Sequence, residues 1–456
     1  MQHAASLVLL RQRNTTEVYW VRRRPETSFL SGFHAFPGGL VEDCDWDDTD
    51  SEHTAIKRAA LRETFEEVGV DVNERHLDYL GRWIAPPYLV RAFSTHYFLC
   101  RQGDLEPHVD DDNPELDDGE WIRPEDALNR WADGDVLIAP PTRALLNALV
   151  SQNGDLTEHS FPEPESSGIE PTLSAIRHDL MMIPLRTPTL PPATHTNTYI
   201  LGRDVIFIVE PASPHTSALD ELFAYLDQRL EDGAQLKAIL LTHHHHDHIG
   251  GVKQTARRYN LPVWAHEETA NRVPFTIHRT LNDGEVIESD PGTKWEVLHT
   301  PGHAPGHLCF LDQVTKSMVV GDMVAGLGSI LVEPNDGDMT QYLESLERMR
   351  LLNPSCLLPS HGPPIGGADA KLSQYIDHRL AREADLVDAL RRGLELLPDL
   401  VNAVYQDVPA PLRSGPSGGL AGMSLMSHLI KLKKESRVNH EGDRWKWPRD
   451  EVIASE

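Results

Sequence analysis

The sequence predicts a multidomain protein of mixed α/β and α+β class. The chain has 456 residues, more than one ordinary hydrophobic core accommodates, so we expect two to four domains. Residues 151–174 are rich in Ser, Pro, Gly and Glu, which is typical of a linker. Strand-like and helical patterns alternate on both sides of this stretch, and helical patterns dominate the end of the chain. We therefore expect domains at residues 1–150, 175–366 and 367–456.

The first domain is expected to alternate strands and helices. Apolar runs of strand length occur at residues 4–10, 18–21 and 95–99, and a helical pattern covers residues 54–68. Residues 104–120 hold nine acidic side chains. We expect this acidic stretch to form a solvated loop.

The same patterns continue beyond the linker. Strands are expected at residues 194–201, 205–209, 236–241, 263–266, 295–299 and 317–320, with helices at 217–229 and 339–349. A long amphipathic helix is expected at 368–392, followed by helical segments at 397–405 and 420–432 and a short tail that contains tryptophan. The second domain is therefore predicted to be α/β and the third mainly helical.

Composition narrows the function classes. The chain carries 42 Lys and Arg against 70 Asp and Glu, a net charge of −28, which disfavours broad binding to nucleic acid but leaves a local basic patch open. Four scattered cysteines form no C-x-x-C pair, so neither a disulfide framework nor a cysteine zinc site is indicated. No apolar run reaches ~18 residues and no basic segment precedes the first one, so we expect a cytoplasmic protein with no membrane span. The oligomeric state is not indicated.

A histidine-rich motif follows the strand predicted at 236–241. Residues 242–251 read THHHHDHIGG and lead into a helical pattern. His243 and His245 are two positions apart, so in an extended segment both point to one side and can chelate one metal ion. Asp247 and His248 can reach a neighbouring ion. Neutral imidazole is the commonest biological ligand for zinc, and a purification tag would lie at a terminus instead.

Further ligand candidates follow other predicted strands. His303 comes after a Pro-Gly turn, Asp322 ends the strand at 317–320, and His361 follows the strand-like run at 357–359. Each residue alone is a weak signal, because most single histidines at strand ends are structural. Together they extend the set to seven side chains. Two metal ions ~3.5–4 Å apart activate water and stabilise a leaving oxygen.

These motifs resemble the successive metal motifs of the metallo-β-lactamase superfamily, over about residues 175–366. The resemblance implies an αββα sandwich and a hydrolase that uses a hydroxide bound to two zinc ions, with Asp247 among the catalytic residues. It places His243, His245 and His303 on one ion, Asp247, His248 and His361 on the other, and Asp322 between them. His244, His246 and His307 fall outside the pattern, and we expect them to support or pack against the site.

Two other stretches narrow the branch of the superfamily. Asp336-Gly337-Asp338 precedes a helix, and residues 375–383 read YIDHRLARE after the last metal histidine. Both resemble the branch of β-lactamase-like endoribonucleases and acyl-carrier thioesterases, which ends in a small winged-helix-like domain. That branch implies single-stranded RNA or a thioester as substrate. Four basic residues of the tail could bind phosphate, although a solvated helix face is favoured: Lys431, Lys433, Lys434 and Arg437.

A second chemical signature lies in the first domain. Glu63, Glu66 and Glu67 fall at i, i+3 and i+4, so a helix places all three carboxylates on one face. Such carboxylates repel one another unless cations lie among them, and Mg²⁺ prefers oxygen ligands that it shares with substrate phosphates. An ordinary exposed acidic helix is the alternative.

With Phe36-Pro37-Gly38-Gly39 upstream, this segment resembles the core of the Nudix box. The resemblance covers about residues 1–150 and implies an αβα domain that hydrolyses nucleoside diphosphates linked to another moiety. It makes Glu63, Glu66 and Glu67 ligands of Mg²⁺ or Mn²⁺, Glu67 catalytic, and Arg62 an orienting residue.

The sequence departs from the Nudix box in three ways. About nine residues are inserted between Gly39 and Arg62, Thr54 stands at the first glutamate position, and Thr64 stands at an aliphatic one. Glu52 could replace the missing glutamate. The insertion is similar to that of coenzyme-A-diphosphatase-like members.

The sequence therefore predicts a hydrolase with two catalytic domains. The second domain would cleave a thioester or another acyl or phosphoester substrate, and the first a nucleoside diphosphate derivative, with coenzyme A as a possible common substrate. One alternative is a single-strand endoribonuclease. Another is a metal hydrolase that a non-catalytic, nucleotide-sensing Nudix-like domain regulates.

Overall fold

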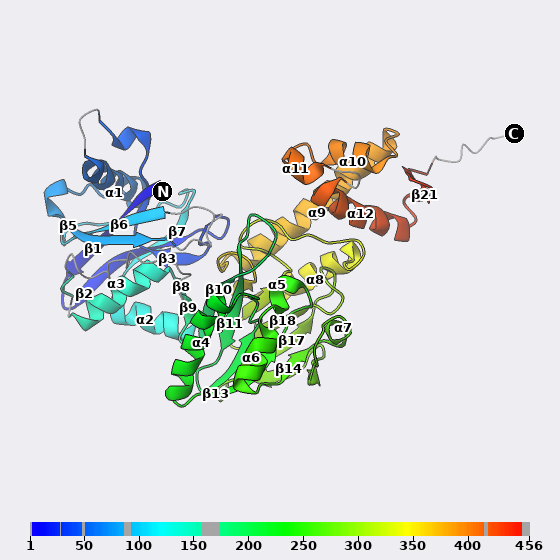
Figure 1. Ribbon diagram of the computed structural model, residues 1–456. Helices are drawn as coiled ribbons and strands as arrows, with labels where there is room; N and C mark the ends of the chain where they lie inside the picture. The colour runs from blue at the N-terminus through cyan, green and yellow to red at the C-terminus, as the bar shows by residue number, and fades with distance from the viewer. Residues whose placement is uncertain are drawn as a thin grey trace.

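The chain folds into three structural units that follow one another in sequence (Figure 1). The computed structural model describes residues 2–27, 29–47, 51–85, 93–152, 154–156, 174–414 and 418–448. Most of the predicted linker at 151–174 lies outside these residues, so the proposed domain boundaries stay a prediction.

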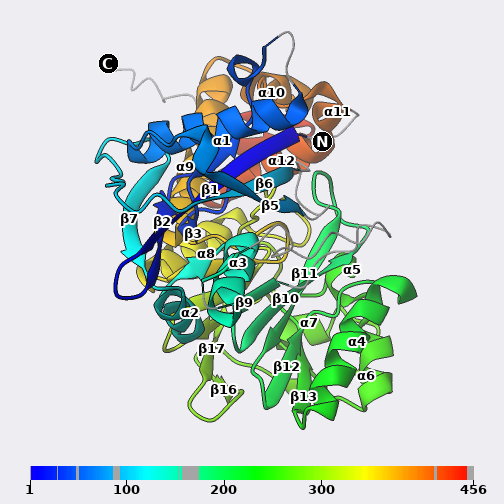
Figure 2. The same ribbon diagram turned by 90° about the vertical axis from the view of Figure 1, so that its left-hand side faces the viewer.

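The N-terminal body is an eight-stranded sheet with helices on both faces (Figures 1 and 2). The central order of its strands is β5-β6-β1-β2-β3-β8, with β4 paired to β1 and β7 paired to β2. Its strands are β1 (Gln2–Gln12), β2 (Thr16–Arg23), β3 (Phe33–Ala35), β4 (Gly38–Leu40), β5 (Leu77–Ile84), β6 (Phe93–Cys100), β7 (Leu116–Ile122) and β8 (Leu137–Ile138). Its helices are η1 (Asp43–Asp45), α1 (Glu52–Val68), η2 (Glu74–His76), α2 (Pro124–Asp133) and α3 (Pro140–Ser151).

Alternation along the first strand explains this three-layer arrangement. Successive side chains of a strand point to opposite faces of its sheet. Leu7 and Leu9 of β1 accordingly pack with α1, whereas Val8 and Leu10 pack with α2 and α3. The predicted αβα domain is confirmed.

The prediction of a loop at residues 104–120 is wrong at its end. Residues from Leu116 onward form β7, which pairs antiparallel with β2. Only Leu116 and Ile122 of this strand are buried. Most residues between them are acidic, so the sequence lacks the alternating apolar pattern that predicts a strand.

Two sheets form the second body. The order of the seven-stranded sheet is β15-β14-β13-β12-β11-β10-β9, and that of the five-stranded sheet is β16-β17-β18-β19-β20. The first sheet contains β9 (Ser174–Arg177), β10 (Leu180–Arg186), β11 (His195–Leu201), β12 (Val205–Val209), β13 (Gln235–Leu240), β14 (Val263–Ala265) and β15 (Arg279–Thr280). The second contains β16 (Val286–Glu288), β17 (Lys294–His299), β18 (Leu308–Asp312), β19 (Ser317–Gly321) and β20 (Cys356–Pro359).

These sheets pack face to face between layers of helices. Phe207 and Val209 of β12 point toward the second sheet, where they pack in one core with Phe310 and Val319. The next residues along β12 point outward to α4 and α6, and the outer face of the second sheet packs on α8 and α9. The order is therefore helix, sheet, sheet, helix, which confirms the predicted αββα sandwich. Its helices are α4 (Thr216–Glu231), α5 (His246–Ile249), α6 (Val252–Tyr259), α7 (Glu267–Ala270), α8 (Met339–Leu351) and α9 (Ala368–Arg391).

The C-terminal body is a small helical domain with a hairpin. Helix α9 packs on the sandwich through its first half and on the C-terminal helices through its second half, and Figure 1 shows it joining the two bodies. Its other elements are α10 (Leu397–Val404), α11 (Ala410–Arg413), α12 (Gly419–Lys434), β21 (Asn439–Glu441) and β22 (Arg444–Lys446). The sequence predicted its main helices but not the hairpin. Within the described residues, none of the helices combines the length and apolar content of a membrane span.

A buried arginine ties the two sheets of the sandwich together. Arg177, at the end of β9, is bonded to Asp179 beside it, to Asp312 at the end of β18 (2.7 Å) and to the hydroxyl of Thr315 (2.5 Å). Its side chain is 4% exposed and that of Asp312 1%. Breaking such a buried network leaves unpaired charge inside the protein.

We expect Arg177→Met to lower the free energy of unfolding of the sandwich by about 3–5 kcal/mol, because two buried aspartates lose their partner. Urea denaturation followed by tryptophan fluorescence measures this change. Arg123→Met, which removes an exposed pair with Asp126, is the control and should leave the midpoint unchanged. Equal effects of the two substitutions would contradict the assignment.

Candidate metal centre

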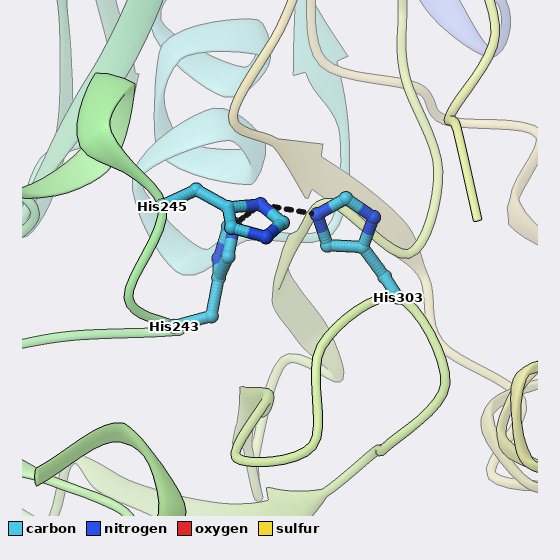
Figure 3. Close-up of side chains that lie close together, drawn as sticks. All are labelled: His243, His245 and His303. Atoms are coloured by element: carbon cyan, nitrogen blue, oxygen red, sulfur yellow. Dashed lines mark hydrogen bonds between the residues drawn. The ribbon is translucent and has the colours of Figure 1, made fainter. Parts of the chain in front are cut away.

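All seven predicted zinc ligands lie at one edge of the sandwich, directly after strands. His243, His245, Asp247 and His248 follow β13, His303 follows β17, Asp322 follows β19 and His361 follows β20. These strand ends belong to both sheets, so the sandwich brings together residues far apart in sequence. Figure 3 shows the rings of His243, His245 and His303 pointing toward one another.

The first group is formed by three imidazoles. His245 Nδ1 lies 3.0 Å from both His243 Nε2 and His303 Nε2. The three residues form a candidate metal group. Burial lowers the pKa of His303 to about 4 and that of His243 well below its usual value. Both rings are therefore neutral at physiological pH, which is the form that binds a metal.

The second group consists of Asp247, His248 and His361. Asp322 lies between the two groups, because its carboxylate is 3.6 Å from His303 Nε2, 3.6 Å from His248 Nε2 and 3.4 Å from His361 Nε2. Burial alone would raise the pKa of Asp322, but the nearby rings of His361 and His248 lower it well below the usual range. A buried carboxylate that stays ionised between two clusters of imidazoles suits a ligand shared by two cations.

Two buried atoms, one in the second group and one in Asp322, support the presence of a cation. His248 Nε2 and Asp322 Oδ1 have no hydrogen-bond partner in the described part of the chain. Buried polar atoms without a partner are costly, and a metal ion would satisfy both. The donor set of five imidazoles and two carboxylates fits zinc or a similar divalent transition metal.

Each imidazole is oriented by its second nitrogen. That nitrogen contacts an oxygen outside the cluster, which fixes the ring and its tautomer and leaves the other nitrogen facing the centre. The contacts are His243 Nδ1 to Thr242 Oγ1 (2.8 Å), His245 Nε2 to Asp336 Oδ2 (2.9 Å), His303 Nδ1 to the carbonyl of Leu331 (2.9 Å), His248 Nδ1 to Glu210 Oε2 (2.9 Å) and His361 Nδ1 to the carbonyl of His195 (3.0 Å).

Glu210 is a residue of the site that the sequence analysis missed. It directly follows β12 and is 1% exposed. Its carboxylate accepts from the backbone nitrogen of Thr242 (3.0 Å), from His248 Nδ1 (2.9 Å) and from the hydroxyl of Ser360 (3.0 Å). Its position in the sequence could have indicated its role, because Glu210 directly follows a buried apolar strand, as Asp322 does.

The three histidines outside the motif pattern have different surroundings. His307 is buried, and its Nε2 accepts from the backbone nitrogen of Asp322 (3.1 Å), so it supports the segment that carries this aspartate. His244 Nε2 lies 3.3 Å from Asp336, in a further candidate group with His245. His246 is exposed at the start of α5.

Residues 330–338 connect the metal centre to the C-terminal domain. Three consecutive carbonyls each accept a hydrogen bond: Ile330 from Arg379, Leu331 from His303, and Val332 from Ser427. Lys434 Nζ lies 2.5 Å from Asp338, which caps α8. The segment that orients His303 and His245 is therefore held by α9 and α12.

In the N-terminal domain, the three glutamates are not equivalent. Glu67 is buried and its carboxylate accepts from the backbone nitrogen of Gly38 (2.7 Å); burial raises the pKa of Glu67 to about 8. Glu63 lies against Gly39, where a side chain would collide with its carboxylate. Arg62 bonds Glu63 (2.9 Å) and Glu66 (3.0 Å), and Glu66 is largely exposed.

The Nudix-like helix thus brings Glu63 and Glu67 into the lining of one cavity, whereas Glu66 is exposed and does not belong to that lining. Asp45, which the sequence analysis missed, lies in η1 inside the predicted insertion, is 2% exposed and pairs with Arg62 (3.0 Å). Glu52 begins α1 and lies 3.5 Å from His3. The described residues of this domain include no preformed group of three metal ligands, so a cation here would draw its remaining ligands from substrate or water.

Comparison with known proteins finds three family matches along the chain. Residues 191–361 match the model of the metallo-beta-lactamase superfamily, residues 1–139 the NUDIX domain and residues 397–447 the beta-lactamase associated winged helix domain. The lactamase-like protein aptB of Emericella nidulans is 32% identical over 258 residues, which cover 54% of this chain and 78% of that protein. The chain belongs to the metallo-beta-lactamase superfamily.

Two further proteins resemble this chain. An atrochrysone carboxyl ACP thioesterase of Aspergillus chevalieri is 31% identical over 226 residues, covering 47% of this chain and 69% of that protein. A beta-lactamase domain protein from Burkholderia ambifaria has the same fold, with a TM-score of 0.53, 20% identity and coverage of 62% of this chain and 96% of that one. The predicted resemblances to both families and the prediction of a hydrolase are confirmed. The ligand assignments and the metals stay predictions.

We expect Asp336→Asn to weaken zinc binding by about 10- to 100-fold, because a neutral amide orients His245 less strongly than a carboxylate. Competition with a chromophoric chelator measures the affinity. Asp220→Asn, on the exposed face of α4, is the matched control and should bind zinc as the wild type does. Unchanged affinity in Asp336→Asn would refute the orienting role.

We expect Mg²⁺ binding in the NUDIX domain to strengthen as pH rises from 6 to 9. Below a pKa of about 8 Glu67 holds a proton that the cation must displace, and above it the carboxylate is free. Calorimetric Mg²⁺ titration at several pH values of the zinc-loaded protein tests this. Glu67→Gln should remove most of the pH dependence, and a Glu67→Gln profile identical to that of the wild type would exclude Glu67 as its source.

Proposed function

We propose that the lactamase domain hydrolyses a thioester or a related acyl ester at a centre of two zinc ions. The observation that carries this proposal is the convergence of two ligand groups on Asp322, one with three imidazoles and the other with Asp247, His248 and His361. The first group would hold one ion, the second group the other, and Asp322 both. When bound, the two ions supply Lewis acidity and lower the pKa of a water molecule.

The residues of the chain perform the remaining tasks. Burial would raise the pKa of Asp247, but His248, a hydrogen bond with Thr189 and His361 together lower it, so its carboxylate is ionised and can accept a proton. Asp247 retains partial exposure (19%), whereas His248 has none. The centre is therefore open to substrate on the side of Asp247 and closed behind His248.

A thioester is the preferred substrate class for two reasons. The similar proteins include two that are named atrochrysone carboxyl ACP thioesterase. The attached NUDIX domain suits a nucleoside diphosphate derivative held by Mg²⁺ or Mn²⁺ at Glu63 and Glu67. Coenzyme A thioesters combine both bonds in one molecule, so we propose them as the first substrates to test.

The C-terminal domain supports the endoribonuclease alternative less well than the thioesterase proposal is supported. Three of the four basic tail residues form ion pairs within the chain: Lys431 and Arg437 with Glu383, and Lys434 with Asp338. These cations are already partly neutralised, which weakens a phosphate-binding surface. The regulatory alternative is distinguished by Glu67→Gln, which would leave all turnover intact if the NUDIX domain only senses a nucleotide.

We expect the zinc-loaded wild type to hydrolyse acyl-CoA, with release of a free thiol that a colorimetric thiol reagent detects. His245→Ala should reduce kcat/KM by more than about 100-fold, because it removes a ligand rather than a residue that only orients one. His246→Ala, an exposed neighbour in the same histidine run, is the matched control and should retain activity.

Three results would count against this function. They are unchanged turnover in His245→Ala, an equal loss in His246→Ala, and inactivity of the wild type on every thioester tested. Cleavage of a fluorescent single-stranded RNA by the wild type but not by His245→Ala would instead select the endoribonuclease.

A further inference from the structure

A cavity of about 720 Å³ lies where the NUDIX domain meets the lactamase domain. This volume lies within the range of small-molecule sites. The NUDIX side contributes all the charged residues of the lining, namely Glu42, Glu63, Glu67, Glu115 and Arg23, together with aromatic side chains such as Phe36 and Trp83. Strand β8 of the NUDIX domain lies beside β9 of the sandwich (Figure 1), and residues of both domains line the cavity.

The lactamase side of the cavity is apolar. Ile176 of β9 and Met182 of β10 line it, together with Leu327 and Pro363. Leu327 follows Asp322 by five positions, and Pro363 follows His361 by two. The wall is therefore built from the segments that continue from two of the predicted zinc ligands.

Hydrogen bonds fix this wall in place. The backbone nitrogen of Gly326 donates to the carbonyl of His361 (2.8 Å), which joins the two segments. Asn197 Nδ2 donates to the carbonyl of Gly362 (2.8 Å). On the NUDIX side, Ser31 accepts from the backbone nitrogens of Gly366 (2.8 Å) and Gly367 (2.9 Å).

The two sides differ in chemistry, and the difference points to the ligand. Glu63 and Glu67 suit a divalent cation that bridges to a diphosphate. Ile176, Met182, Leu327 and Pro363 offer no charge and suit an apolar group. A ligand that carries a diphosphate at one end and an apolar remainder at the other would match both sides.

We propose that this cavity binds a Mg²⁺-coordinated nucleoside diphosphate ester and that the lactamase domain recognises its apolar remainder through Leu327, Pro363 and Met182. The inference rests on the NUDIX part of the proposed function and adds a specificity surface that belongs to the other domain. Residues of the lactamase domain then determine which compounds the NUDIX domain accepts.

Calorimetric titration of the full, zinc-loaded chain in Mg²⁺ tests this with two probes. One is the α,β-methylene analogue of ADP, and the other is the β-octyl ester of the same analogue. Neither has a cleavable bond between its phosphorus atoms, so binding is measured without turnover. Burial of about two methylene groups against the wall predicts that the octyl ester binds roughly tenfold more tightly.

Substitutions at Leu327 locate the effect. Leu327→Trp would occupy the space beside the apolar wall, and Leu327→Ser would remove apolar surface from it. Both should therefore reduce the preference for the octyl ester to less than about threefold while the parent analogue still binds. Leu351→Trp, an equivalent change at an exposed leucine of α8, should keep the full preference.

Equal affinity of the wild type for the two probes would overturn the proposal. So would an unchanged preference in both Leu327 variants, or the absence of Mg²⁺-dependent binding of either probe. Thioester hydrolysis by the lactamase domain does not depend on these titrations, so each proposal can fail while the other stands.

Discussion

The architecture of the candidate metal centre depends on the hydrogen bonds that the carboxylate of Glu210 accepts. It follows β12 and binds Thr242 after β13, His248 in the histidine motif and Ser360 after β20. Strands β12 and β13 belong to one sheet and β20 to the other, so one buried carboxylate fixes both sheets at the edge that carries the ligands. A buried carboxylate is stable only with such partners. The loops that aim the imidazoles are thereby held in one arrangement.

Segments that extend from the ligands also connect the three domains. Residues 330–338 orient His303 and His245 on one side and accept bonds from Arg379 and Ser427 of the C-terminal region on the other. Leu327 and Pro363 continue from Asp322 and His361 and close the NUDIX cavity. Both neighbouring domains thus contact the lactamase domain close to its candidate metal centre, and the NUDIX domain also contacts it through α2 at β9.

The sequence predicted several elements that have local signals, such as β1, β12 and α9, but not β10 and β18, although most of their side chains are buried. The seven candidate ligands were selected because each lies in a short motif after a strand. Glu210 was missed because a single glutamate after a strand has no motif around it. Strand β7 and the hairpin of β21 and β22 were missed because few of their side chains are buried. The cavity could not be foreseen, since residues as distant in sequence as Glu67, Met182 and Leu327 meet only in the folded chain.

We infer that two cations bind on either side of Asp322. Anomalous diffraction at the zinc absorption edge from crystals of the zinc-loaded protein locates such cations. We expect two peaks, one among His243, His245 and His303 and one among Asp247, His248 and His361, with the Asp322 carboxylate adjacent to both. A single peak, or peaks only at other positions such as the Glu63 and Glu67 carboxylates, would contradict it.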